Sequence, residues 1–262
     1  MATSSPQVTS ASRADDSYYP SSLHEEALAR LSYLAEKGSA CGLLLGPTGS
    51  GKSLILSLFA HQQRKQGGAV AAVNALGATV KELLLEIGTA WGANVRTFDE
   101  LPILWKAVSD RLRELEIEKV PALLLIDDLH QATTEAAALV DRLHAFAEAS
   151  AATLLVIAAC ESRCQHSLTT RLLSRTQLRV DLDCWHLEET AGFLQEWLVQ
   201  NGGEGQEFDE QAISVLHELA EGNPRKVRQL AEQTMLASSK ESAGPLREDV
   251  VQAAFEELCI DG

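Results

Sequence analysis

The feature that most constrains the fold of this chain is the run Gly46-Pro47-Thr48-Gly49-Ser50-Gly51-Lys52-Ser53, which matches the pattern G-x-x-x-x-G-K-[ST] at every fixed position. Glycines let consecutive backbone N–H groups turn inward around phosphate oxygens, and the positive end of the following helix points at the same oxygens. In this pattern the lysine reaches the β- and γ-phosphates, and the hydroxyl after it binds Mg²⁺. Residues Gly46 to Leu54 are therefore predicted to bind ATP, with Lys52 acting on the phosphates and Ser53 ligating the magnesium ion.

The residues on either side of this loop have the pattern that the motif requires. Residues 41–45 form a short apolar run, which is typical of a buried parallel strand, and residues 54–60 continue from the loop as an apolar-rich helix. A chance glycine-rich turn is the alternative interpretation. It does not account for a strand before the loop and a helix after it, so the sequence favours nucleotide binding.

A second acidic motif follows a later apolar strand. Residues 121–126 are apolar and lead directly into Asp127-Asp128-Leu129-His130. Asp127 is predicted to bind the Mg²⁺ shell, because a hard cation takes oxygen ligands. Asp128 is predicted to accept a proton from the attacking water. Acidic residues also cap strand ends without any function, but this pair follows a phosphate loop and has helices on both sides.

Strands and helices alternate along the first two thirds of the chain. Apolar strands are predicted at 41–45, 69–73, 121–126, 153–159 and 177–182, with helices between them, which predicts an α/β fold with a five-stranded parallel sheet in an αβα sandwich. From residue 185 onward the pattern is all-helical. The predicted organisation is a disordered tail at 1–17, a nucleotide-binding domain at 18–184 and a small helical domain at 185–262. Cys160 and Glu161 end the fourth strand, where a γ-phosphate sensor or a simply buried cysteine is expected, and the buried cysteine is favoured.

Three arginines are candidates for a role in turnover. Arg225 opens a helix after Gly222-Asn223-Pro224 and is predicted to reach the triphosphate from the helical domain. Arg171 and Arg175 are candidates for acting on the γ-phosphate of a neighbouring subunit, where a guanidinium offsets developing negative charge. The alternatives are an exposed arginine at 225 and arginines that only complement a helix dipole at 171 and 175.

Composition excludes several classes of protein. The 262 residues carry 22 Lys and Arg against 37 Asp and Glu, a net charge of −15 that disfavours non-specific binding of duplex DNA. Five cysteines and seven histidines show no disulfide framework and no metal-ligand spacing, so magnesium bound with the nucleotide is the one metal expected. No apolar run approaches the ~18 residues of a membrane span, and no signal peptide is recognisable. The sequence therefore predicts a soluble cytoplasmic protein.

The motifs together resemble those of AAA+ ATPases, and more narrowly the ExeA/GspA-type ATPases of general secretion and pilus-like systems, which are close to the TniB/MuB-type ATPases of transposition. The resemblance covers residues 18–260. It rests on four motifs: the lead-in Tyr19-Pro20 with His24-Glu25-Glu26-Ala27-Leu28, the phosphate loop, the Leu124–His130 stretch, and Gly222-Asn223-Pro224-Arg225. It implies a helical lid, Walker A roles for Lys52 and Ser53, Walker B roles for Asp127 and Asp128, and the sensor 2 role for Arg225.

Two departures from the AAA+ pattern bear on activity. Asp128 stands where a glutamate is usual and is one methylene shorter, and Cys160 lies near the sensor 1 position, so hydrolysis is expected to be slow. The leading hypothesis is an ATP-hydrolysing homo-oligomer, with an arginine acting in trans, that couples nucleotide state to assembly or partner remodelling in secretion or pilus-like machinery. The alternatives are a TniB/MuB-like regulator that oligomerises on duplex DNA, and a nucleotide switch that barely hydrolyses ATP.

Overall fold

The computed structural model describes residues 18–201, 207–238 and 245–260, so the predicted tail at 1–17 lies outside the described residues. The chain divides into two compact units. The sheet unit contains residues 26–46 and 52–181, and the helical unit contains residues 19–25, 47–51 and 182 onward. The phosphate loop is thus shared between them, and each unit is described by itself. The domain boundary predicted between residues 184 and 185 stays a prediction.

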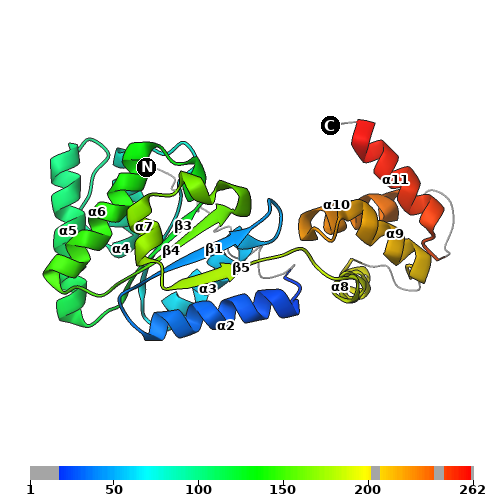
Figure 1. The fold of residues 1–262 in the computed structure, drawn as a ribbon, viewed down its shortest axis with the longest axis horizontal. Coiled ribbons are helices and arrows are strands. Elements are labelled where there is room, and N and C mark those ends of the chain that lie inside the picture. The colour runs from blue at the N-terminus through cyan, green and yellow to red at the C-terminus, as the bar shows by residue number, and fades with distance from the viewer. Residues whose placement is uncertain (1–17, 202–206, 239–244, 261–262) are drawn as a thin grey trace, which may run out of the picture. The chain divides into compact units, whose positions relative to one another are not determined.

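The sheet unit is built on five parallel strands in the order β2-β3-β4-β1-β5, which confirms the predicted fold class (Figure 1). The apolar side chains of the central strands β1, β3 and β4 are buried on both faces, as expected of a parallel sheet covered by helices. The bounds are β1 Ala40–Gly46, β2 Ala69–Asn74, β3 Ala122–Asp127, β4 Leu154–Glu161 and β5 Leu178–Asp181.

Helices cover both faces of this sheet (Figure 1). Alternate side chains of the central strands, such as Leu124 and Val156, join one core cluster with α4, α5 and α6. The strand residues between them face α2 and α3; a Cβ on Gly42 of β1 would come within 2.8 Å of Leu34 on α2, so glycine permits the close approach. The bounds are α2 Ser22–Glu36, α3 Lys52–Lys65, α4 Val80–Trp91, α5 Leu101–Glu118 and α6 Thr134–Ser150.

The segment between β4 and β5, where the sequence predicted a helix, forms two separate helical pieces. A 3₁₀ segment, η2, covers Ser162–Ser167, and a short helix, α7, covers Thr170–Arg175. The break occurs because the hydroxyl of Thr169 accepts the backbone N–H of Leu172, which starts a new helix at that point. A further 3₁₀ turn, η1 Leu129–Gln131, follows β3.

The helical unit has its own apolar core, which Trp185, Phe193 and Trp197 share with side chains of the later helices. Tyr19 from the lead-in packs edge-on against Trp185 and Phe193, with ring centroids 5.6 and 5.8 Å apart. The bounds are α8 Leu187–Gln200, α9 Glu210–Ala220, α10 Pro224–Ser238 and α11 Glu248–Ile260. Within the described ranges of the chain, none of the helices is both long enough and apolar enough to cross a membrane.

Candidate nucleotide site

The carboxyl edge of the sheet unit gathers the polar strand ends that the sequence singled out. Asn74 of β2 lies in register with Asp127 of β3, and Gly46 of β1 lies in register with Glu161 of β4. Because the strands are parallel, their carboxyl ends meet at one edge, and α3 begins there with Lys52. This edge therefore brings the predicted lysine and the predicted acidic pair together.

Lys52 is a buried ammonium group surrounded by acidic side chains. The residue is 8% exposed, and its Nζ donates a hydrogen bond to the carbonyl oxygen of Gly46 at 3.0 Å. Burial lowers the pKa of Lys52, and the nearby carboxylates of Asp127, Asp128 and Glu161 oppose that shift. The edge thus combines the Lys52 ammonium with several carboxylates. Because these carboxylates repel an anion, a triphosphate would bind there together with a further cation.

The acidic pair is held in a defined turn after β3. Asp128 has a left-handed backbone with φ of 52°, and its N–H donates to Oδ1 of Asp127 at 3.0 Å. The amide of Asn74 donates to Oδ2 of Asp128 at 3.3 Å. Ser53 is exposed in the first turn of α3. Sequence reasoning missed Asn74; the signal was available, since Asn74 is a polar residue ending a strand at the same edge.

The end of β4 presents one inert and one available side chain. Cys160 is fully buried, and burial raises the pKa of its thiol to about 12, so it stays neutral. This confirms the interpretation of Cys160 as a buried cysteine. Glu161 is partly exposed and is the polar group that this strand offers at the edge.

In the helical unit the loop residues 47–51 pack on the start of α10. Asn223 donates from Nδ2 to the carbonyl oxygen of Thr48 at 2.7 Å. The N–H of Arg225 donates to the carbonyl oxygen of Gly49 at 3.3 Å. Gly49 has φ of 88°, and a Cβ on it would lie 2.5 Å from Oδ1 of Asn223. Only glycine fits this position, and the contact places Arg225 directly against the loop.

His24 also contacts the loop backbone. Its Nε2 lies 3.0 Å from the carbonyl oxygen of Ser50, and a Cβ on Gly51 would come within 2.6 Å of the same nitrogen. The histidine is buried. The sequence had identified His24 only as part of the lead-in motif, and it did not identify the loop carbonyl as the partner of the ring.

The two candidate trans-acting arginines differ in their surroundings. Arg175 donates from Nη2 to Oε2 of Glu148 on α6 at 2.7 Å and is half-buried. Arg171 is exposed, and its guanidinium forms no ion pair with any described residue. Arg175 therefore pairs with a side chain of its own chain and Arg171 is exposed, while a trans-acting role for either arginine stays a prediction.

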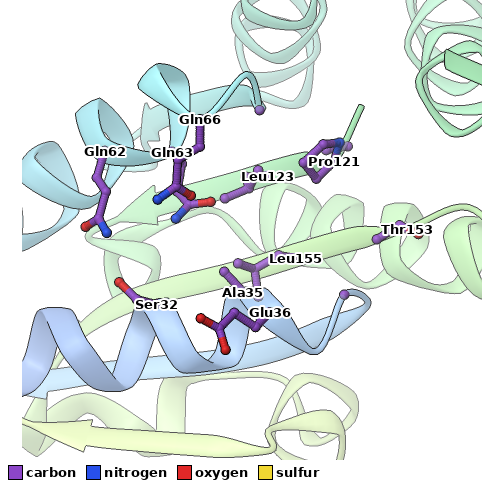
Figure 2. A pocket seen from close by; sticks show the side chains of 13 residues that line it. Ser32, Ala35, Glu36, Gln62, Gln63, Gln66, Pro121, Leu123, Thr153 and Leu155 are labelled. Carbon is purple, nitrogen blue, oxygen red and sulfur yellow. The ribbon is translucent and has the colours of Figure 1, made fainter. Parts of the chain in front are cut away.

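A cavity of about 260 Å³ lies at the opposite, amino edge of the sheet unit (Figure 2). It is bounded by α3, which contributes Gln62, Gln63 and Gln66, by the end of α2 with Glu36, and by Thr153 before β4. Gln63 is 6% exposed, and its side-chain amide has no hydrogen bond to the part of the chain that the structure describes. This edge therefore buries a neutral amide rather than charged groups.

A five-stranded parallel sheet with a phosphate loop between β1 and α3 is the fold of the P-loop AAA+ ATPases. The model of the AAA domain family matches residues 35–168, more than half of the chain. The chain therefore belongs to the AAA domain family, whose members are generally ATPases. Among curated proteins, no sequence relative of the chain was found.

Solved structures with the same fold are distant in sequence. Cdc6p from Pyrobaculum aerophilum matches with a TM-score of 0.72 at 14% identity over 95% of this chain and 71% of its own. The RuvB Holliday junction branch migration motor of Thermotoga maritima matches with 0.62 at 15% identity, over 90% and 68%. Aeropyrum pernix ORC2, in ADPNP–ADP complexes, matches with 0.63 at 16% identity, over 94% and 67%. At these identities the likeness concerns the fold alone.

Proposed function

We propose that this protein binds ATP with Mg²⁺ and hydrolyses it. The observation that carries the proposal is the buried Lys52 ammonium at the start of α3, beside the carboxylates of Asp127 and Asp128. A buried cation with a lowered pKa gains most from an anionic ligand, because a bound phosphate offsets the desolvation of the ammonium group. The membership of the chain in the AAA domain family supports the same assignment.

The donor set at this edge suits magnesium. Ser53 offers an exposed hydroxyl and Asp127 a carboxylate, which are the hard oxygen ligands that Mg²⁺ takes alongside phosphate oxygens. When bound, the ion would neutralise charge on the β- and γ-phosphates. Lys52 would bind the same phosphates and orient them for in-line attack.

Asp128 would hold the attacking water and accept its proton. Its left-handed backbone and the hydrogen bond from Asn74 keep the carboxylate in one position. Because aspartate is one methylene shorter than the glutamate usual in AAA+ proteins, we expect a low turnover rate. A nucleotide switch with negligible hydrolysis is the limiting case of the same site.

Arg225 would complete the site from the helical unit, as the sensor 2 residue of the AAA+ pattern. Its N–H already bonds to Gly49 of the phosphate loop, and the loop is one continuous chain with Lys52. Arg225→Ala keeps this backbone bond but removes the guanidinium that would contact the triphosphate, so turnover should fall at least tenfold. Arg228→Ala is the matched control, because Arg228 lies on the same helix and pairs with Glu232.

We further propose that the protein works as a homo-oligomer in which Arg171 reaches the γ-phosphate held by a neighbour. The test mixes Lys52→Ala subunits, which keep the arginine, with Arg171→Ala subunits, which keep the ATP site. Turnover restored on mixing supports action in trans, and mixtures no more active than the separate variants refute it. Arg175→Ala is the control, since Arg175 pairs with Glu148 of its own subunit.

The process that we propose is secretion or pilus-like assembly of the ExeA/GspA type, on the motif resemblance and the net charge of −15. The TniB/MuB-like alternative predicts that duplex DNA stimulates turnover. Steady-state ATP hydrolysis of the purified protein, with and without duplex DNA and beside Asp128→Asn, separates the readings. Turnover that is unchanged by DNA and absent in Asp128→Asn supports the secretion-type ATPase. Clear stimulation by DNA supports the TniB/MuB-like regulator. Turnover no higher than that of Asp128→Asn supports the nucleotide switch.

A further inference from the structure

Three side chains with different metal-binding atoms lie together where the turns after β3 and β4 meet. His130 belongs to η1, Glu161 ends β4, and Cys164 lies in η2. Nε2 of His130 is 3.9 Å from Oε2 of Glu161, and Sγ of Cys164 is 3.8 Å from the same oxygen. One ligand atom from each residue lies within 4.8 Å of the other two.

We propose that His130, Glu161 and Cys164 form a zinc-binding site. In a tetrahedral zinc site, bond lengths of about 2.0–2.3 Å place neighbouring ligand atoms roughly 3.3–3.8 Å apart. The separations of 3.9 and 3.8 Å lie at the upper end of that range or just above it, and the third lies within 4.8 Å, so a zinc ion would require rotations of side-chain torsions that draw the three ligand atoms together. Three protein ligands leave the fourth position for water.

The donor set distinguishes this site from the magnesium site proposed beside it. Mg²⁺ takes oxygen ligands, whereas an imidazole nitrogen and a thiolate sulfur favour Zn²⁺ and related transition metals. The proposed magnesium ligands Ser53 and Asp127 offer oxygen alone. The zinc proposal therefore requires no nucleotide, and it stands or falls separately from ATP hydrolysis.

The cluster is partly prepared for a metal ion. The side chain of His130 is 6% exposed, and its Nδ1 accepts the N–H of Glu161 at a long 3.5 Å. Zinc binding through Nε2 would move the ring proton to Nδ1 and end this weak hydrogen bond. Cys164 is partly exposed, whereas the neighbouring Cys160 is fully buried. Metal binding would convert the Cys164 thiol to a thiolate and release its proton to solvent.

A bound zinc ion would fasten the turn that carries Asp128 to the end of β4. It would also engage Glu161, one of the carboxylates that act on Lys52. Sequence spacing could not reveal this cluster, because the histidine comes from a segment remote from the E-x-x-C pair. The parallel sheet brings the two segments together.

Titration of the metal-free protein with Co²⁺, in buffer containing excess Mg²⁺ and no nucleotide, tests the proposal. Cobalt replaces zinc and reports its ligands: we expect the visible bands of tetrahedral Co²⁺ together with a thiolate-to-cobalt charge-transfer band, both abolished by one equivalent of Zn²⁺. Absence of the charge-transfer band in this buffer, with or without the weak bands of octahedral Co²⁺, would indicate that no thiolate binds the ion and would overturn the proposal.

Single variants identify the ligands. Cys164→Ser should remove the charge-transfer band and weaken binding at least tenfold, and His130→Gln should weaken binding by a similar factor. Cys184→Ser is the matched control, since Cys184 is also partly exposed but belongs to the helical unit. Circular dichroism checks that each variant is folded, and Glu161→Gln provides a third, nearly isosteric test. Unchanged affinity in folded Cys164→Ser, or equal loss in Cys184→Ser, refutes the assignment.

Discussion

Helix α3 connects two edges of the sheet that differ in the polar side chain they bury. At its first residue Lys52 is 8% exposed and lies among the carboxylates of the strand ends. Near its last turn Gln63 is 6% exposed beside the cavity at the amino edge (Figure 2). One helix therefore buries a charge at one end and a neutral amide at the other.

The difference follows from what surrounds each end. At the carboxyl edge the helix N-terminus and the ammonium favour anions, and the carboxylates of Asp127 and Asp128 favour a cation. At the amino edge, Glu116 of α5 uses its carboxylate to accept the N–H of Thr153 and to pair with Lys119. The carboxylate of Glu116 therefore holds the backbone just before β4 in place. The sheet carries the proposed nucleotide site at one edge and structural hydrogen bonds at the other.

The largest expected effect is the loss of ATP turnover when Asp128, at the carboxyl edge, is replaced. Asp128→Asn keeps the shape of the side chain and its hydrogen bond with Asn74, but it removes the group that accepts a proton. Turnover of ATP should fall by about 10²-fold or more, with nucleotide affinity nearly unchanged. Single-turnover hydrolysis and equilibrium binding of a fluorescent ATP analogue measure the two separately. An unchanged rate would remove Asp128 from the mechanism.

Loss of the buried ammonium comes next. Lys52→Ala should weaken ATP binding by roughly 10- to 100-fold, because a charged hydrogen bond to phosphate is worth about 1.5–3 kcal/mol. Calorimetric titration with ATP and Mg²⁺ measures the change. Lys52→Arg serves as the control that keeps the charge and loses the shape. Equal affinity in Lys52→Ala and the unaltered protein would contradict the entire site.

Asn74 tests whether positioning matters at this edge. Asn74→Ala removes the 3.3 Å hydrogen bond to Asp128, so the carboxylate should sample other orientations. We expect turnover to fall a few-fold, in keeping with about 1 kcal/mol for one neutral-donor bond, while KM stays constant. Asn74→Asp should be worse, since a second carboxylate would repel Asp128. A rise in KM at constant kcat would instead indicate a role in binding.

The amino edge should respond in stability rather than in activity. Gln63→Met replaces a cavity-lining amide that has no described partner with an apolar side chain of similar length. Because the amide atoms are not fully buried, the variant should stabilise the protein by at most about 0.5 kcal/mol. Gln62→Met is the control, because Gln62 is only half-buried and should change little. Urea unfolding followed by circular dichroism reads out both. Destabilisation by Gln63→Met would show that the amide has a partner.

The smallest expected effect is the pH-dependent stability that Glu116 contributes at the amino edge. The N–H of Thr153, followed by Lys119, lowers the pKa of Glu116 from 4.5 to about 2. A depressed carboxyl pKa contributes stability above pH 4.5 that is lost as the pH falls toward 2. Glu116→Gln should therefore lower the urea midpoint at neutral pH, and the difference should vanish in acid. A difference that is independent of pH would contradict this linkage.

The phosphate loop and the acidic pair at the carboxyl edge were predictable because each is a short contiguous motif in the sequence. The phosphate loop predicts a strand, a turn and a helix in fixed order, so the position of Lys52 at the start of α3, after β1, followed directly. Apolar runs of strand length separated by helical patterns were sufficient for the five-stranded parallel sheet. The roles assigned to Arg171, Arg175 and Arg225 remain predictions, because they depend on neighbours in space.

By itself, then, the sequence determined the fold class, the position of the loop and the acidic pair, because each depends on residues adjacent in the chain. Tertiary structure alone decided which distant side chains meet: Asn74 with Asp128, Asn223 with Thr48, and His130 with Glu161 and Cys164. It also decided that Gln63 is buried without a described partner. The physical reason is that hydrogen bonding and metal ligation act over a few ångströms in space, and strand register and helix packing set those distances.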